Sequence, residues 1–164
     1  MRILGIDPGY ALVGFGVLDY NNNRYDVVDY GVISTPKEEN LPNRLMTIAK
    51  CLEQIIDTYK PDVVAVEELF FFKNQKTVIP VAEARGVIIL TCMQKNLSIF
   101  EYTPLQIKQA LTGNGRAEKA QIQFMTKTIL GLEKIPKPDD AADAIAVAIC
   151  HSQINPMLNI NRVV

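Results

Sequence analysis

Apolar residues follow two repeating patterns along the chain, one typical of strands and one typical of amphipathic helices. Continuous or alternating apolar runs predict strands over 2–7, 14–18, 25–33, 62–67 and 98–102. Apolar residues at helical spacing predict helices over about 42–59, 77–95, 104–111, 117–131 and 140–153. The asparagines 21–23 predict a hairpin turn between the second and third strands, because asparagine tolerates a left-handed backbone.

The order of these elements predicts the fold class. Three successive strands form an antiparallel meander, and the later strands are reached through crossover helices. We therefore expect an α/β protein with a mixed five-stranded sheet and helices on both faces. The 164 residues suit a single domain over 1–164. The tail from about 155 has little charge, and we assign it no function.

Acidic residues stand where buried segments end or begin. Asp7 closes the first predicted strand, Glu67 closes the fourth, and Asp140 and Asp143 open the last helix. If those two strands are parallel neighbours, Asp7 and Glu67 meet at one edge of the sheet. The helix adds two more carboxylates, because residues i and i+3 share a face. Buried carboxylates need compensation, which Mg²⁺ or Mn²⁺ commonly provides, so the pattern predicts an acidic metal cluster.

Alternatives to these assignments stay open. Glu68 competes with Glu67, although strand alternation points it to the other face of the sheet. Asp139 competes with Asp140, because a spacing of four to Asp143 also shares a helical face. Asp139 and Asp140 also suit capping of the helix N-terminus, which is compatible with metal binding at Asp140.

The amino-acid composition argues against several classes of protein. Three scattered cysteines, one histidine and no CxxC pair argue against a zinc site, a disulfide framework and a Cys–His hydrolase. No apolar run is long enough to span a membrane, and the N-terminus turns polar too soon for a signal peptide, so we expect a cytoplasmic protein. The net charge of −1 does not indicate nucleic-acid binding. Basic residues nevertheless outnumber acidic ones between 108 and 137, which is compatible with a basic face.

Short motifs lie in order along nearly the whole chain. They are Ile3–Gly9 with Gly14–Gly16, Ala65–Phe70 followed by Lys73-Asn74, Ala84–Val87, Ile107–Gln109, Gly113–Lys119 and Asp140–Ala144. Together they resemble the RuvC family of bacterial Holliday-junction resolvases. The resemblance implies an RNase H-like fold, a homodimer, Mg²⁺ dependence and symmetric nicking of four-way DNA junctions in recombination and repair. It also implies cooperation with a branch-migration complex of the RuvA–RuvB type.

The same resemblance implies catalytic roles. Asp7, Glu67, Asp140 and Asp143 match the metal ligands of the family, which implies two Mg²⁺ ions per site, with Mn²⁺ as a substitute. Two such ions activate a water and stabilise the leaving 3′ oxygen. Lys119 matches a basic residue of the family, and we expect it to stabilise charge on the phosphate in the transition state.

DNA-binding roles and the dimer also rest on the resemblance. Lys73, Lys108, Arg116 and Lys119 would hold the DNA backbone, a contribution that salt weakens. Phe70 matches an aromatic residue that stacks on splayed bases. The two phenylalanines that follow depart from the family pattern, so which of the rings at 70–72 stacks stays open. Apolar residues of the predicted helix 77–95 serve either the core or the dimer surface, among them Val78, Val81, Ile88 and Ile89.

Three other classes of protein share part of the pattern. An actin-like ATPase has a similar first motif around Asp7, but it pairs two such domains and has no role for the last acidic pair. An RNase H-like nuclease that acts on RNA would share the acids without the aromatic and basic sets. A non-catalytic junction-binding module would not need four carboxylates that face a DNA phosphate.

Overall fold

The computed structural model of the protein describes residues 1–69, 77–154 and 161–163. These residues form one five-stranded sheet, in the order β3-β2-β1-β4-β5, and five helices. The strands are β1 Arg2–Asp7, β2 Leu12–Asn21, β3 Arg24–Ser34, β4 Val63–Glu67 and β5 Ser98–Tyr102. The helices are α1 Leu41–Tyr59, α2 Val78–Gln94, α3 Pro104–Thr112, α4 Lys119–Ile129 and α5 Asp139–Gln153.

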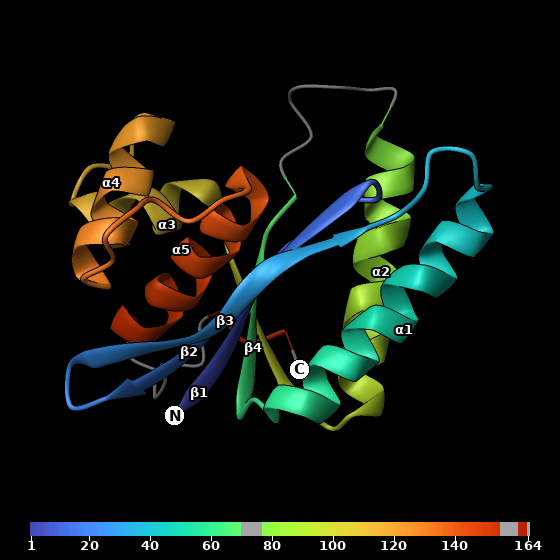
Figure 1. Ribbon diagram of the computed structural model, residues 1–164, viewed down its shortest axis with the longest axis horizontal. Coiled ribbons are helices and arrows are strands. Elements are labelled where there is room, and N and C mark those ends of the chain that lie inside the picture. Colours follow the sequence, from blue (N-terminus) through green and yellow to red (C-terminus); the bar gives the residue numbers. More distant parts are fainter. Residues whose placement is uncertain (70–76, 155–160, 164) are drawn as a thin grey trace.

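The sheet is mixed, as the sequence predicted. β1, β2 and β3 pair antiparallel, whereas β1 and β4, and then β4 and β5, pair parallel. Figure 1 shows α3, α4 and α5 on one face of the sheet and α1 and α2 on the other. The predicted hairpin turn is confirmed by the left-handed backbone of Asn22 and Asn23. β2 is longer than predicted, because its pairing with β3 runs from Leu12 to the turn.

Strand alternation separates two cores. Ile3 and Ala65 face α5, while Leu4 and Val64, their neighbours along the chain, face α1 and α2. α5 is buried over most of its length, because small and apolar residues make up most of it. Asp7 and Glu67 follow the alternation of Ile3 and Ala65, so both point to the α5 side of the sheet.

Glycines allow α5 to approach β1 and β2 closely. A Cβ on Gly5 would lie 2.1 Å from a backbone oxygen of α5, and one on Gly16 would lie 2.6 Å from an α5 side chain. A Cβ on Gly14 would lie 2.0 Å from the carbonyl oxygen of Asp140. Because Gly14 pairs with Asp7 in the sheet, the first turn of α5 lies beside the end of β1.

The described end of the tail covers part of the outer edge of β5. The backbone N–H of Glu101 donates to the carbonyl oxygen of Asn161, and the backbone N–H of Val163 donates to the carbonyl oxygen of Ile99. The N···O distance is 2.8 Å in each. The sequence suggested no function for the tail. In the structure, its described residues form hydrogen bonds with backbone groups of the edge strand β5.

Candidate active site

The four predicted carboxylates gather around the carboxyl ends of β1 and β4. Asp7 ends β1 and Glu67 ends β4, and these strands are parallel neighbours. Asp140 and Asp143 come from the first two turns of α5, which the glycines hold against the sheet. After burial itself, the other three acids are the groups that raise the pKa of Asp7. The expectation that these acids meet at one edge of the sheet is therefore confirmed.

The surroundings of Asp7, Glu67 and Asp143 disfavour negative charge and raise the pKa of each. Burial, followed by repulsion from the neighbouring acids, holds the pKa of Asp7 well above its usual range. Burial, followed by repulsion from Asp143, raises the pKa of Glu67 from 4.5 to about 7. Within the described part of the chain, no side-chain hydrogen bond stabilises the charged form of Asp7 or Glu67. The positive charges of Lys119 and Lys108 offset the effect on Glu67 only in part.

Lys119 is the cation in direct contact with the cluster. Its Nζ donates to Oδ2 of Asp143 at 2.9 Å and lies 3.5 Å from Oδ2 of Asp139. Burial lowers the pKa of Lys119, but the two aspartates together raise it by more. Lys119 is thus a protonated partner of one predicted metal ligand, a contact that the sequence did not reveal.

Asp139 and Asp140 are the first two residues of α5, and Pro138 is the N-cap residue. The expectation that these aspartates cap the helix is therefore wrong. Lysines draw the side chain of Asp139 away instead, because Nζ of Lys137 donates to its Oδ1 at 2.6 Å. This hydrogen bond, with the charge of Lys119, keeps the pKa of Asp139 below its ordinary value.

A pocket of about 170 Å³ opens beside the carboxylates. One part of its lining is charged and the other is apolar. The charged residues are Glu67, Lys108, Lys119 and Asp143, and the apolar ones are Pro104, Ile107, Ile122 and Ala146. The apolar part was not expected as part of a site, because its helical spacing indicates core residues. The pocket can thus hold a charged group and an apolar group side by side.

Glu68 does not belong to the carboxylate cluster. It lines a separate pocket with Glu101 and with Ala82 and Arg85 of α2, which covers the opposite face of the sheet. The expectation that Glu68 points away from Glu67 is confirmed.

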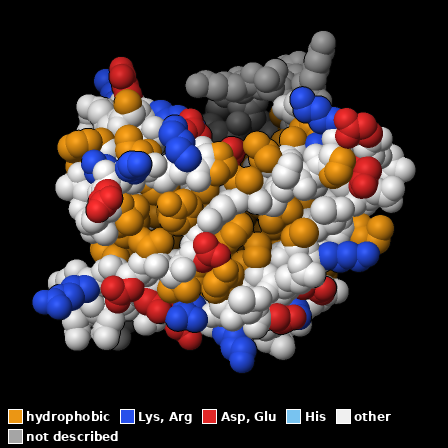
Figure 2. Space-filling view, viewed as in Figure 1, with side chains coloured by type: hydrophobic (Ala, Val, Ile, Leu, Met, Phe, Trp, Pro, Cys, Tyr) orange, Lys and Arg blue, Asp and Glu red, His pale blue; other side chains and the backbone are white. Residues whose placement is uncertain are grey.

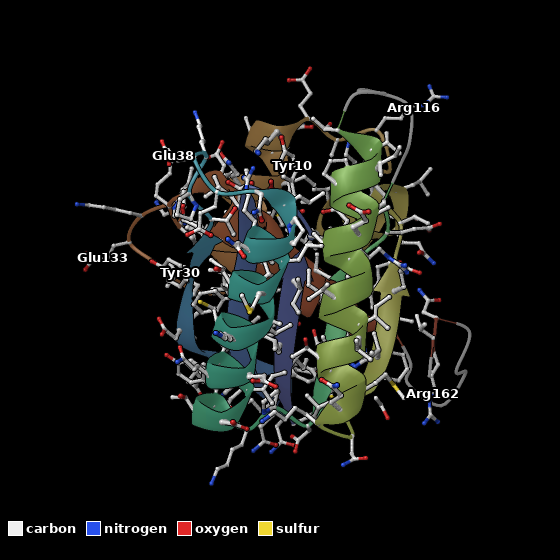
Figure 3. The ribbon with its side chains drawn as sticks, turned by 90° about the vertical axis from the view of Figure 1, so that its right-hand side faces the viewer. Tyr10, Tyr30, Glu38, Arg116, Glu133 and Arg162 are labelled. Atoms are coloured by element: carbon white, nitrogen blue, oxygen red, sulfur yellow. The ribbon has the colours of Figure 1, made fainter. Side chains whose placement is uncertain are left out.

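The remaining DNA-binding predictions fall on two segments. Arg116 is exposed in the connection between α3 and α4, and Figure 3 shows it at the same end of the molecule as Tyr10, which lies just beyond β1. Figure 2 shows Lys and Arg side chains gathered over α4 and the segment before α5. Phe70 and Lys73, like the phenylalanines 71–72, lie outside the described residues.

The donor set fits a hard divalent cation by its chemistry, because it consists of carboxylate oxygens alone. Over residues 1–69, 77–154 and 161–163, however, no three Asp, Glu, His or Cys side chains form a ready-made metal site. One oxygen of Asp143 is engaged instead by the ammonium group of Lys119. Asp143 would hold a cation through this oxygen only if Lys119 moved away from it.

A mixed five-stranded sheet, with acids at the ends of β1 and β4 and at the start of a helix across them, is the arrangement of RNase H-like nucleases. Residues 3–151 match the family model described as crossover junction endodeoxyribonuclease RuvC. The chain belongs to this family.

Relatives and a solved structure agree with this assignment. The crossover junction endodeoxyribonuclease RuvC of Caldicellulosiruptor saccharolyticus is 60% identical over 152 residues, which cover 92% of each chain. That of Petrotoga mobilis is 60% identical over 151 residues, which cover 92% of this chain and 93% of the relative. The structure of Thermus thermophilus RuvC in complex with Holliday junction substrate has a TM-score of 0.92 at 30% identity and covers 99% of each chain. The predicted RNase H-like fold is therefore confirmed.

Proposed function

We propose that this chain resolves four-way DNA junctions by symmetric nicking of two opposing strands, in homologous recombination and repair. The carboxylate cluster beside an open pocket carries the proposal, because phosphodiester hydrolysis by RNase H-like nucleases uses such a cluster. Membership of the RuvC family supports the junction as the substrate. The solved relative that carries a Holliday junction covers nearly the whole chain, which supports the same substrate.

We further propose that Asp7, Glu67, Asp140 and Asp143 hold two Mg²⁺ ions, with Mn²⁺ as a substitute. When bound, the ions supply an activated water and stabilise the leaving 3′ oxygen. The burial of Asp7 and Glu67 supports the proposal, because it leaves both carboxylates poised to gain from a cation. Because their pKa values are raised, Asp7 and Glu67 must release a proton to act as ligands, so the site strengthens as the pH rises.

Lys119 and Lys108 would act on the phosphate. Both line the pocket together with Glu67 and Asp143, so a phosphate that enters it meets their ammonium groups. Lys119 would stabilise the charge that develops in the transition state. Lys108, with Arg116 and Lys73, would hold the DNA backbone.

The exposed side of α2 supports the proposal of a homodimer. Ile79 and Leu90 are 69% and 57% exposed, and they lie at helical spacing from Gly86 and Met93. A Cβ on Gly86 would meet nothing within 4 Å, so packing within the described part of the chain does not require a glycine there. Glycine costs about 1 kcal/mol in a helix interior, and close approach of a second helix would account for it. Figure 3 shows α1 and α2 side by side, with α2 accessible along its length.

A C₂ dimer would present two identical sites to a junction that is itself close to two-fold symmetric. Family membership supports cooperation with a branch-migration complex of the RuvA–RuvB type. None of the described helices is long and apolar enough to cross a membrane. We place the protein in the cytoplasm, where its DNA substrate would be.

Cleavage of a synthetic four-way junction tests the proposed function. The junction, a linear duplex and an RNA–DNA hybrid are incubated with Mg²⁺ and either the parent protein or Asp7→Asn. We expect cleavage of the junction alone, and none with the variant. Cleavage of the hybrid instead would assign another substrate to the same site. Tight binding of the junction without nicking, with any divalent metal, would contradict the catalytic role of the carboxylates.

A further inference from the structure

Lys119 lies between two aspartates of α5 that differ in their surroundings. Its Nζ is 2.9 Å from Oδ2 of Asp143 and 3.5 Å from Oδ2 of Asp139. The side chain of Asp143 is 27% exposed and lines the pocket with Glu67, whereas that of Asp139 is 45% exposed. The lysine therefore has one partner inside the carboxylate cluster and a second at its rim.

A cation that takes Oδ2 of Asp143 removes the shorter contact of Lys119. Without another acceptor, the ammonium group would lose its ion pair as the ion enters, and this loss would weaken ion binding. Asp139 already lies within ion-pair distance of the same Nζ, so a small rotation of the lysine side chain replaces the contact.

We propose that Asp139 is a positioning residue, which receives the ammonium group of Lys119 when a divalent cation takes Asp143. The proposal rests on the proposed function, because it requires Asp143 to be a metal ligand. Asp139 would thereby assist the site without contacting the ion, and it would keep Lys119 beside the pocket where the phosphate binds.

The contacts of Asp139 leave room for this role. Lys137 donates to Oδ1 of Asp139 at 2.6 Å, whereas Lys119 approaches Oδ2. The two lysines therefore do not compete for the same oxygen. As the first residue of α5, Asp139 also lies at the positive end of the helix dipole, which stabilises its negative charge.

A double-mutant cycle in Mn²⁺ affinity tests the proposal, with free Mn²⁺ measured by electron paramagnetic resonance and no DNA present. The four proteins are the parent, Asp139→Asn, Lys119→Met and the double variant. Asp26→Asn controls for the change in net charge, because Asp26 pairs with Asp19 at the opposite end of β2 from the carboxylates. Thermal unfolding checks that each variant is folded.

We expect Asp139→Asn to weaken Mn²⁺ binding roughly threefold in the parent background. A change of this size corresponds to the loss of one partly exposed ion pair. In the Lys119→Met background, which has no ammonium group to move, the same change should weaken binding much less, because only the charge that Asp139 exerts on Asp143 through space is lost. Equal weakening in both backgrounds would show that Asp139 acts on the ion directly and would overturn the proposal. An unchanged affinity in both backgrounds, or in the parent alone, would overturn it as well.

Asp7→Asn separates this outcome from failure of the metal site itself. We expect it to abolish or strongly weaken Mn²⁺ binding at the site. Mn²⁺ binding that is absent from the parent, or unaffected by Asp7→Asn, would refute the proposed metal site, and the role of Asp139 would fall with it. A site that depends on Asp7 but shows no coupling between Asp139 and Lys119 would refute only the role of Asp139.

Discussion

Replacing Glu67 by glutamine should stabilise the metal-free protein while it abolishes cleavage. Glu67 ends β4 on the α5 side of the sheet, and within the described ranges no side-chain hydrogen bond stabilises its charged form. Burial and repulsion from Asp143 raise its pKa from 4.5 to about 7. The folded protein thus holds a proton at Glu67 that the unfolded chain releases, and ionisation of this group opposes folding.

The pKa of Glu67 fixes the size and the pH dependence of this cost. Well below pH 4.5 the carboxyl is protonated in both states, and the cost is absent. As the pH rises from 4.5 to about 7, the unfolded chain loses the proton first, so stability falls across this window and then levels off. At about 1.4 kcal/mol for each pKa unit, the ionised group costs the folded protein about 3 kcal/mol at pH 8. Glu67→Gln removes this cost, but burial of the glutamine amide without hydrogen-bond partners destabilises the variant by about 1 kcal/mol.

Urea unfolding in the presence of EDTA measures the effect. We expect Glu67→Gln to raise the free energy of unfolding by about 2 kcal/mol at pH 8 and to give no gain at pH 4.5. Glu68→Gln is the matched control, because Glu68 lies in a different pocket, and it should show no such pH-dependent gain. An equal effect of Glu67→Gln at both pH values would refute the electrostatic reasoning, as would destabilisation at pH 8.

Three further substitutions test the close packing of α5 on the sheet, the dimer and the DNA contacts. Gly14→Ala should lower cleavage of the junction about a hundredfold, because the added Cβ would lie 2.0 Å from a carbonyl oxygen of α5 and would displace the acids. Gly31→Ala is the control in the same assay and should have a much smaller effect, because its Cβ would meet only an aromatic ring, at 3.1 Å. Leu90→Glu should convert a dimer to monomers in sedimentation experiments, and a variant that sediments as the parent does would contradict the α2 interface. Arg116→Gln should weaken junction binding at every sequence and lower the salt dependence by about one counterion, whereas an unchanged salt slope would exclude Arg116 from the phosphate contacts.

The elements and the acidic cluster could be predicted because local patterns determine them. Continuous apolar runs of strand length mark β1 and β4, and each run ends in the acid that reaches the site. That these two strands are parallel neighbours was only a condition of the prediction; the structure meets it, although β2, β3 and α1 lie between β1 and β4 along the chain. Asp140 and Asp143 followed from the start of an apolar helix.

The contacts within the site could not be predicted, because they join residues that are distant in the sequence. Lys119 and Asp143 are 24 positions apart, and only the packing of α4 against α5 brings them together. The capping role expected for Asp139 and Asp140 is wrong because Pro138 takes the N-cap position while lysines engage Asp139. The close approach of α5 to Gly14 likewise depends on the register of the sheet rather than on a local sequence pattern.

Mapping the nicks on a four-way junction tests the central claim most directly. Each of the four strands carries its own label, so that every nick is assigned to a strand and a position in the presence of Mg²⁺ or EDTA. The proposed function predicts paired nicks at symmetry-related positions in two opposing strands, which require Mg²⁺ and disappear with Asp7→Asn. Nicks confined to one strand, nicks that persist in EDTA, or equal cleavage of linear duplex would contradict it.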